Sequence, residues 1–494
     1  MPITLRHITA DSTWLITLTS PHNPPSHAPF NILVDPWLVG PSEVWHPKFA
    51  QNHHTTPSSI PSLADLDPQP DVLLISQTKS DHCNEATCRQ LDSKDAKLQV
   101  YAVPGADGIV KGWKHFDPVN VHRLRPYTSR KSGRVSRIPI YRTQVSDGSG
   151  DDNNKTDRGK DKGGELEEDY TFETDPSVAA VVELAFLPAL KPWEIPSIHI
   201  GLGITYTPME GVSNKALPPS PPLTPPTTSL LHPTVPSAHQ APSTITLSTV
   251  ASNNTSLSPS SQLQSNPGNN TTDKPTHQDS PNRFPKKPSS SSKKKSTNLK
   301  QPGPKIALTD SLLYTPHGVP PSALTQYLSS LPLPLTAFLH CFVKVDNPKW
   351  LGGTVSSGLP NALKILSELK RIRCEQARLV EEPISPKSSC SVEYPLGVKY
   401  LVATHDEEVK LEGFCSHFVK KIKWEAREVS EELTKVAGDE GLDGGRGSRD
   451  LNTNSADDKG EEKEEEDMGN VKAWDGPAGV KLLDLEVGGK VMLV

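Results

Sequence analysis

Three histidines of this chain each follow an apolar segment that reads as a β-strand. They are His82 in Ser76–His82, His317 in Leu312–Gly318, and His405 in Val402–Asp406. Loops at strand ends are where α/β folds gather site residues. A single histidine is more often an independent surface or core residue, but three at strand ends, one of them within an Asp-His pair, favour a shared site. Imidazole and carboxylate groups placed together can bind a metal ion or transfer protons.

The elements that would position these side chains are short and alternate between strand and helix. A predicted strand at Asp71–Ser76 precedes His82, and another at Asn31–Val34 ends at Asp35. A helix is expected over Glu85–Leu91, with Asn84 as its N-cap. Further strands are expected at Thr13–Leu18, Leu98–Val103, Ser197–Thr207, Lys305–Leu313, Lys399–Ala403 and Val480–Val494, and a helix at Leu359–Lys370. This alternation is typical of an α/β domain.

Three segments have too few large apolar residues to build a core. Residues 144–174 are rich in Asp, Lys and Gly, residues 209–304 in Ser, Pro, Thr and Asn, and residues 437–470 are Gly-rich and acidic. Such segments cannot offset chain entropy, so we expect them to be disordered insertions. The domain would then be assembled from residues 1–143, 175–208 (core strands), 305–436 and 471–494 (a terminal strand). The strands flanking the 209–304 insertion would form a hairpin with an enlarged loop.

Composition narrows the class of protein. Only 34% of the 494 residues are hydrophobic, and the net charge of −6 gives no global case for nucleic-acid binding. The longest apolar run, residues 178–190, is too short to span a bilayer, and no secretory signal is visible at the start. Six cysteines without a Cys-x-x-Cys pair favour free thiols. We therefore expect a cytoplasmic protein, or a nuclear one if the lysine cluster at 286–295 is a localisation signal, with any protein partners bound through the disordered segments.

Four segments occur in an order and spacing typical of one known family: Ile32–Leu38, Leu73–His82, Leu312–Gly318 and Thr404–Glu407. On these residues the chain resembles the metallo-β-lactamase superfamily, in the branch similar to ascorbate-phosphate lactonases and N-acylphosphatidylethanolamine phospholipases. The resemblance covers nearly all of the chain outside the three polar segments. It implies an αββα sandwich with the site at one edge, between two β-sheets.

The family's His-x-His-x-Asp-His signature is only half preserved here. Gln77 and Lys79 occupy its first two ligand positions. A protonated lysine has no lone pair, and an amide is a poor ligand for zinc. The third histidine of that subsite should fall near Phe186–Lys191, which contains none, so this subsite looks lost. The resemblance implies that the second subsite keeps its donors, which are Asp81, His82 and His405, with His317 in place of a bridging carboxylate.

One aspartate and three histidines suit a single divalent metal ion. Zinc is expected, with iron or manganese as alternatives, and the remaining alternative is that no metal binds. Asp81 could instead orient a water molecule as general base. Lys79 could neutralise an anionic substrate or oxyanion, or it could fill the vacated metal position and pair with Asp81. The resemblance gives Asp35 a supporting role behind the ligands, through hydrogen bonds to the signature loop. Asp406 is expected either to brace His405 as a second supporting residue or to face solvent.

Two functions follow from these residues. The first is a metal-dependent hydrolase of ester, lactone or phosphodiester bonds in a small-molecule substrate, using the single retained subsite. The second is a catalytically inactive pseudoenzyme that keeps the fold as a binding or scaffold module, as Gln77 and Lys79 would favour. Nucleic-acid processing has precedent in the family, but the net charge of −6 argues against it.

Overall fold

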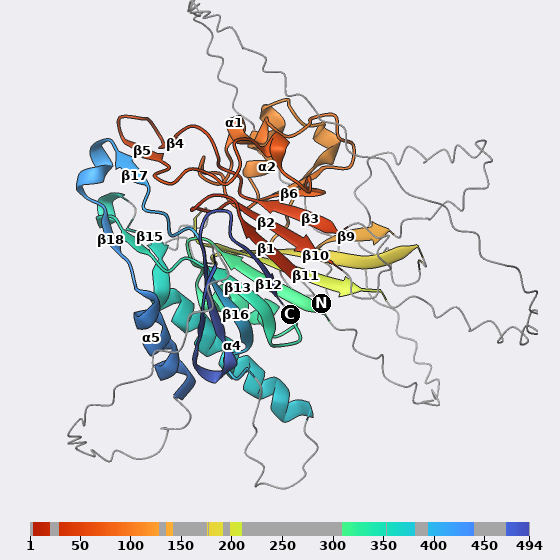
Figure 1. The fold of residues 1–494 in the computed structure, drawn as a ribbon, viewed down its shortest axis with the longest axis vertical. Helices are drawn as coiled ribbons and strands as arrows, with labels where there is room; N and C mark the ends of the chain where they lie inside the picture. The colour runs from red at the N-terminus through yellow and green to blue at the C-terminus, as the bar shows by residue number, and fades with distance from the viewer. Residues whose placement is uncertain are drawn as a thin grey trace, which may run out of the picture. The chain divides into compact units, whose positions relative to one another are not determined.

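Two large β-sheets form the centre of the molecule in the computed structural model (Figure 1). The structure describes residues 3–19, 29–127, 135–141, 175, 177–190, 198–209, 309–351, 353–380, 394–438 and 471–493. These residues all fall within one compact unit.

The first sheet has seven strands, and the last four in its order pair in parallel. Its order is β21 (Lys490–Leu493), β1 (Ile3–His7), β2 (Trp14–Leu18), β3 (Phe30–Val34), β6 (Val72–Ile75), β7 (Gln99–Ala102) and β8 (Val121–Arg123). β6 lies between β3 and β7, parallel to both, and all four of its residues are buried, as expected for a strand covered on both faces. The loops that follow β3 and β6 therefore leave the sheet at the same edge.

The second sheet has eight strands. Its order is β19 (Val471–Asp475), β20 (Lys481–Leu485), β16 (Val398–Ala403), β13 (Leu335–His340), β12 (Asp310–Thr315), β11 (Ile200–Pro208), β10 (Val178–Pro188) and β9 (Ser136–Tyr141). β12, β13 and β16 are parallel, so the loops after β12 and β16 also emerge together. β11 and β12 pair antiparallel, which confirms the predicted pairing of the two strands that flank the long insertion.

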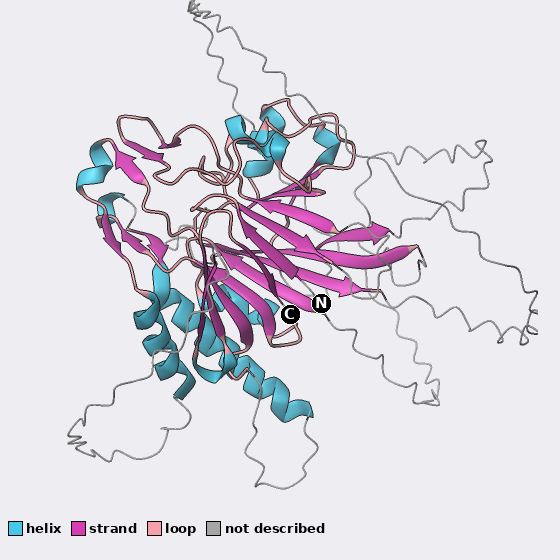
Figure 2. Ribbon diagram, viewed as in Figure 1, coloured by secondary structure: helices cyan, strands magenta, loops and turns pink. Residues whose placement is uncertain are grey.

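Alternating side chains on the second sheet build two cores. On β12, Leu312 and Tyr314 join the core shared by both sheets, whereas Leu313 joins a core under the helices. This second core includes residues of α3 (Pro321–Leu328), α4 (Gly358–Val380) and α5 (Ala426–Gly438). The short helices α1 (Glu85–Cys88) and α2 (Ala106–Gly112) contribute Cys88 and Val110 to the shared core. Figure 2 shows helices on either side of the strands of the two large sheets. The predicted α/β class is confirmed.

The element boundaries differ from the sequence prediction at several points. α1 ends at Cys88, three residues early, although the Asn84 side chain caps it as expected by accepting a hydrogen bond from the Thr87 N–H. α4 runs on to Val380. Residues 471–493 hold three strands instead of one. The turn at Gly476–Gly479 separates β19 from β20, and the Gly488-Gly489 turn separates β20 from β21, which pairs with β1 of the other sheet.

The predicted insertions fall almost wholly outside the described residues. Met209 is one exception. The other is the pair Ala437–Gly438, the last two residues of α5, so the ordered segment predicted to end at residue 436 ends at 438. None of the described helices is long and apolar enough to cross a membrane.

Two small sheets, which the sequence did not indicate, lie beside the large ones (at the left of Figure 1). One contains β15 (Thr354–Ser357), β14 (Lys344–Asp346) and β18 (Lys420–Ile422), and the other β17 (Lys410–Glu412), β5 (Ala50–His53) and β4 (Ser42–Val44). Most of these strands have only three residues, and β17 and β18 pair with strands far away in the sequence, so local periodicity cannot show them.

Candidate metal centre

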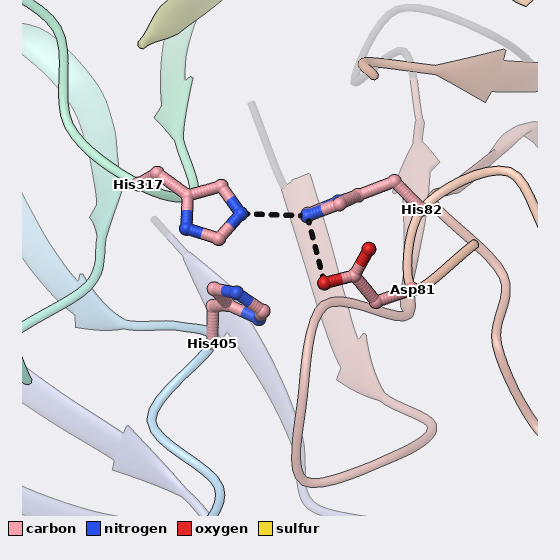
Figure 3. A group of neighbouring side chains, drawn as sticks. All are labelled: Asp81, His82, His317 and His405. Atoms are coloured by element: carbon pink, nitrogen blue, oxygen red, sulfur yellow. Dashed lines mark hydrogen bonds and ion pairs between the residues drawn. The ribbon is translucent and has the colours of Figure 1, made fainter. Parts of the chain in front are cut away.

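Four side chains from loops of both large sheets converge at one point (Figure 3). Asp81 and His82 follow β6, His317 follows β12, and His405 follows β16. One potential ligand atom from each residue lies within 4.8 Å of the others. The four residues that were predicted to form one subsite therefore do lie together, and this His/Asp cluster could hold a metal ion.

A buried carboxylate orients His82. Asp35, directly after β3, receives a hydrogen bond from His82 Nδ1 at 2.8 Å, and it also accepts from the Ser76 N–H at 2.7 Å and the Tyr314 hydroxyl at 2.8 Å. Its backbone has a φ of +44°, a strained conformation for a residue other than glycine. Asp35 thus has the supporting role that the resemblance implied, and its bond to Nδ1 leaves Nε2 of His82 facing the other ligands.

A second carboxylate, which sequence reasoning missed, lies behind His405. Asp11, in the β1–β2 loop, forms an ion pair with His405 Nδ1, and its carbonyl accepts a hydrogen bond from the His405 N–H at 3.0 Å. His405 also has a positive φ, +57°. No pattern in the sequence links Asp11 to His405, which is almost four hundred positions away. The one local signal at Asp11 is the polar Asp-Ser-Thr run directly before a strand.

Asp406 neither braces the His405 ring nor faces solvent, the two alternatives expected for it. Its carboxylate accepts hydrogen bonds from the Phe342 N–H at 2.9 Å and the Val343 N–H at 2.7 Å, so it ties the end of β16 to the loop after β13. The carboxylate that braces the His405 ring is Asp11. Burial raises the pKa of Asp406 to about 7, with the two backbone hydrogen bonds opposing the shift.

Close backbone packing fixes the position of His317. The next residue, Gly318, has a φ of +84°, and a Cβ there would lie 2.8 Å from Asn361 Oδ1 and 2.9 Å from Ser357 Cβ. Only glycine fits this turn without strain. The His317 carbonyl also accepts a hydrogen bond from the Ser357 N–H at 2.9 Å. These contacts place the ring so that its Nε2 lies 3.0 Å from Nε2 of His82.

The three imidazoles differ in their affinity for protons. Burial would lower the pKa of His405, but Asp11 and then Asp81 outweigh it and raise that pKa to about 9. His82 shows the same balance: burial opposes, and Asp35 and Asp81 raise its pKa. Burial, with the nearby His405 and His82, holds the pKa of His317 well below its usual value. The carboxylates therefore favour the protonated forms of His405 and His82. The lowered pKa of His317 favours its neutral form, which has a nitrogen lone pair available for a metal ion.

The donor set fits a divalent metal ion. Two imidazole nitrogens bound tetrahedrally to zinc at about 2.0–2.1 Å would lie about 3.4 Å apart, close to the 3.0 Å between His82 and His317. Two buried atoms, Asp81 Oδ1 and His317 Nδ1, have no hydrogen-bond partner. Imidazoles backed by carboxylates are the usual arrangement around protein-bound metals, because the carboxylate fixes the ring and its tautomer.

The two residues that replace the lost ligands, Gln77 and Lys79, are not among the four clustered side chains. Gln77 is buried and donates from Nε2 to the Ile198 carbonyl at 3.0 Å, and its Oε1 has no partner. The charge of Lys79 contributes to the lowered pKa of His317, so Lys79 lies near the centre. Among the described residues, however, no carboxylate lies within 4.0 Å of its ammonium group. Of the two alternatives for Lys79, the one in which it pairs with Asp81 is therefore not observed in the described structure.

A cavity of about 760 Å³ adjoins the cluster at His405. His405 is the one candidate ligand of the four that lines this cavity. The other lining residues include three aromatic residues and two carboxylates: Phe342, Trp424, Trp474, Glu407 and Asp484. The side chains of His405 and Asp81 are 13% and 15% exposed, while that of His82 is fully buried. Solvent therefore reaches the cluster from the side of Asp81 and His405.

Comparisons with protein-family models, with curated proteins and with solved structures found no match to this chain.

Proposed function

We propose that this chain is a metal-dependent hydrolase with a metallo-β-lactamase-like αββα fold, which uses one metal ion to cleave ester, lactone or phosphodiester bonds. The observation that carries the proposal is the cluster of Asp81, His82, His317 and His405, whose His82 and His405 rings are each backed by a buried carboxylate. The arrangement of two packed sheets, with the cluster at an edge common to both, supports the family assignment.

The chain's own residues would divide the work as follows. His82, His317 and His405 would hold the metal, most suitably zinc, with iron or manganese as alternatives. When bound, such an ion lowers the pKa of a water molecule and polarises a carbonyl or phosphoryl oxygen. Asp81 would either be the fourth ligand or accept a proton from that water, since its Oδ1 is free of hydrogen bonds.

Substrate binding would involve Lys79 and the adjoining cavity. The ammonium group of Lys79 has no carboxylate partner in the described structure, so it is free to stabilise negative charge on a substrate. The cavity of about 760 Å³ is of the size that takes small-molecule ligands, and a substrate held there would meet the centre at His405.

The test is a hydrolysis assay on the purified full-length chain, stripped with chelator and reconstituted with zinc, iron or manganese. We expect activity on at least one of a carboxylic ester, a lactone and a phosphodiester, dependent on added metal and reduced about 10²–10⁴-fold in Asp81→Asn. The competing function is the pseudoenzyme, which the replacements at Gln77 and Lys79 favour. It predicts no metal-dependent turnover in any arm, and that result would refute the hydrolase.

A further inference from the structure

Three exposed aromatic rings lie in the connections next to strands of the two small sheets. Trp45 is 80% exposed, Trp350 66% and Phe414 51%. Soluble surfaces rarely gather large apolar side chains in one place, and such patches mark interaction sites. Because Trp rings have an apolar body and a polar edge, they are also favoured at membrane–water interfaces.

The rings fall into two groups, which we together call the aromatic ridge (Trp45, Phe49, Phe414, Phe418 and Trp350). Trp45 packs on Phe49, with ring centroids 4.6 Å apart, and Phe418 lies 5.1 Å from Phe414 and 5.6 Å from Trp350. The two halves join through the backbone, where the Phe414 N–H donates to the Lys48 carbonyl at 3.0 Å.

The junction is tightly fitted. Gly413, next to Phe414, has a φ of +95°, and a Cβ at that position would lie 2.7 Å from the carbonyl oxygen of Phe49. The approach of the two segments therefore requires glycine. The ridge is a built feature of the fold and not a chance exposure of single side chains.

Positive charge surrounds the ridge although the whole chain carries a net charge of −6. Residues 42–53, 344–357 and 410–423 contain three carboxylates, Glu43, Asp346 and Glu412, against seven lysines, which are Lys48, Lys344, Lys349, Lys410, Lys420, Lys421 and Lys423. Lys344 pairs with Asp346 at 2.6 Å and Lys410 with Glu412 at 2.7 Å. In the described structure the other five lysines have no carboxylate within 4.0 Å.

Strand β18 shows the pattern most plainly. Its residues Lys420, Lys421 and Ile422 are all exposed, and Lys423 follows them on the surface. An exposed aliphatic side chain between lysines suits a surface that is anionic outside and apolar beneath, because the ammonium groups can contact headgroups while Ile422 enters the acyl region.

We propose that the aromatic ridge and β18 form a docking surface for an anionic phospholipid bilayer. A nucleic acid fits less well, since these three segments contain no arginine, the residue best shaped to bind phosphate in two places, and Ile422 cannot stack on bases. The segment that carries Trp45 also contacts the loop before Asp81, because the Ser42 hydroxyl on β4 lies 3.0 Å from the hydroxyl of Ser80. The inference stands without the proposed hydrolase activity.

The test is co-sedimentation of the full-length chain with vesicles of phosphatidylcholine alone or with about 30 mol% phosphatidylserine. We expect binding only to the anionic vesicles, weakened by salt. Lys420→Ala with Lys421→Ala should reduce the partition coefficient about 25-fold, since each surface lysine is worth about fivefold. Trp350→Ala with Phe414→Ala should reduce it at least about tenfold. The matched control, Lys94→Ala with Lys111→Ala on another exposed surface, should bind as the parent chain does.

Depth of insertion gives an independent readout. Brominated lipids in the anionic vesicles should quench part of the tryptophan fluorescence, and Trp350→Phe should remove some of that quenching. The proposal is overturned if the chain does not co-sediment with anionic vesicles. It also fails if the double lysine variant and the double aromatic variant both bind these vesicles as strongly as the control. It is also overturned if the chain binds duplex RNA and not vesicles, and the same substitutions abolish RNA binding, which would assign the surface to nucleic acid.

Discussion

Replacing Asp35 by asparagine should destabilise the chain more than any other isosteric change near the site. The buried carboxylate accepts four hydrogen bonds: Ser76 N–H donates to Oδ1 at 2.7 Å, and the Ser76 hydroxyl, His82 Nδ1 and the Tyr314 hydroxyl donate to Oδ2. The asparagine amide destabilises the fold least if its nitrogen takes the place of Oδ1. The nitrogen then faces the Ser76 N–H, and two hydrogen-bond donors point at each other. That leaves the Ser76 N–H without its acceptor, at about 1–3 kcal/mol, before any cost of the two unpaired N–H groups of the new amide.

The three bonds to the other oxygen would survive as neutral hydrogen bonds. Each weakens by about 1 kcal/mol, so the total loss is at least about 4–6 kcal/mol, a large part of the stability of a typical domain. Urea denaturation at pH 7 measures it. Asp71→Asn is the matched control, because this half-buried carboxylate accepts one bond, from the Asn31 N–H, and an amide oxygen can keep it. A loss in Asp35→Asn below about 1 kcal/mol, equal to the control, would refute the reasoning.

Three further substitutions test other parts of the account. His340 is buried, and burial lowers its pKa to about 4, with the hydrogen bond to the Gly358 carbonyl opposing. Below pH 6.5, the ordinary pKa of histidine, the unfolded chain therefore binds more protons at His340 than the folded chain does. This difference should lower the free energy of unfolding by about 2 kcal/mol between pH 6.5 and pH 5. His340→Gln should flatten that part of the urea-denaturation pH profile, and an unchanged slope would contradict the assignment. Gly318→Ala should lose about 1–3 kcal/mol more than Gly40→Ala, because both have positive φ but nothing lies within 4 Å of a Cβ at Gly40; equal losses would show that the turn after His317 is not tightly packed. Lys79→Ala should reduce kcat/KM for anionic substrates about 10–100-fold and leave bound metal unchanged, whereas a drop in metal content would give Lys79 a structural role instead.

Much of the fold could be predicted from local pattern. Val72-Leu73-Leu74-Ile75 is a continuous apolar run, and it forms the buried strand β6. The strands flanking the long insertion pair as expected, because their hydrophobic pattern is independent of what lies between them. What local pattern could not show is pairing between distant segments, such as β21 with β1, or the three-residue strands of the small sheets.

The candidate site divides in the same way. Asp81, His82, His317 and His405 could be identified because each follows a strand, and parallel strands bring their ends to one edge. Asp35 was accessible for the same reason. Asp11 was not, since it lies in the loop between antiparallel strands and meets His405 only through tertiary packing. Asp406 is beside His405 in sequence, but its side chain turns to the Phe342 and Val343 amides, and sequence proximity misled there.

Bound metal per chain is the most direct test of the central claim. The full-length protein, purified without chelator and analysed by elemental mass spectrometry, should contain about one zinc, iron or manganese ion per chain. His82→Ala and His405→Ala should each reduce this to near zero, while His122→Ala, a histidine that contacts Gln99 and Tyr101 elsewhere in the first sheet, should leave it unchanged. A parent chain that carries no metal and takes up none on titration, or one whose metal content survives both ligand substitutions, would contradict the account.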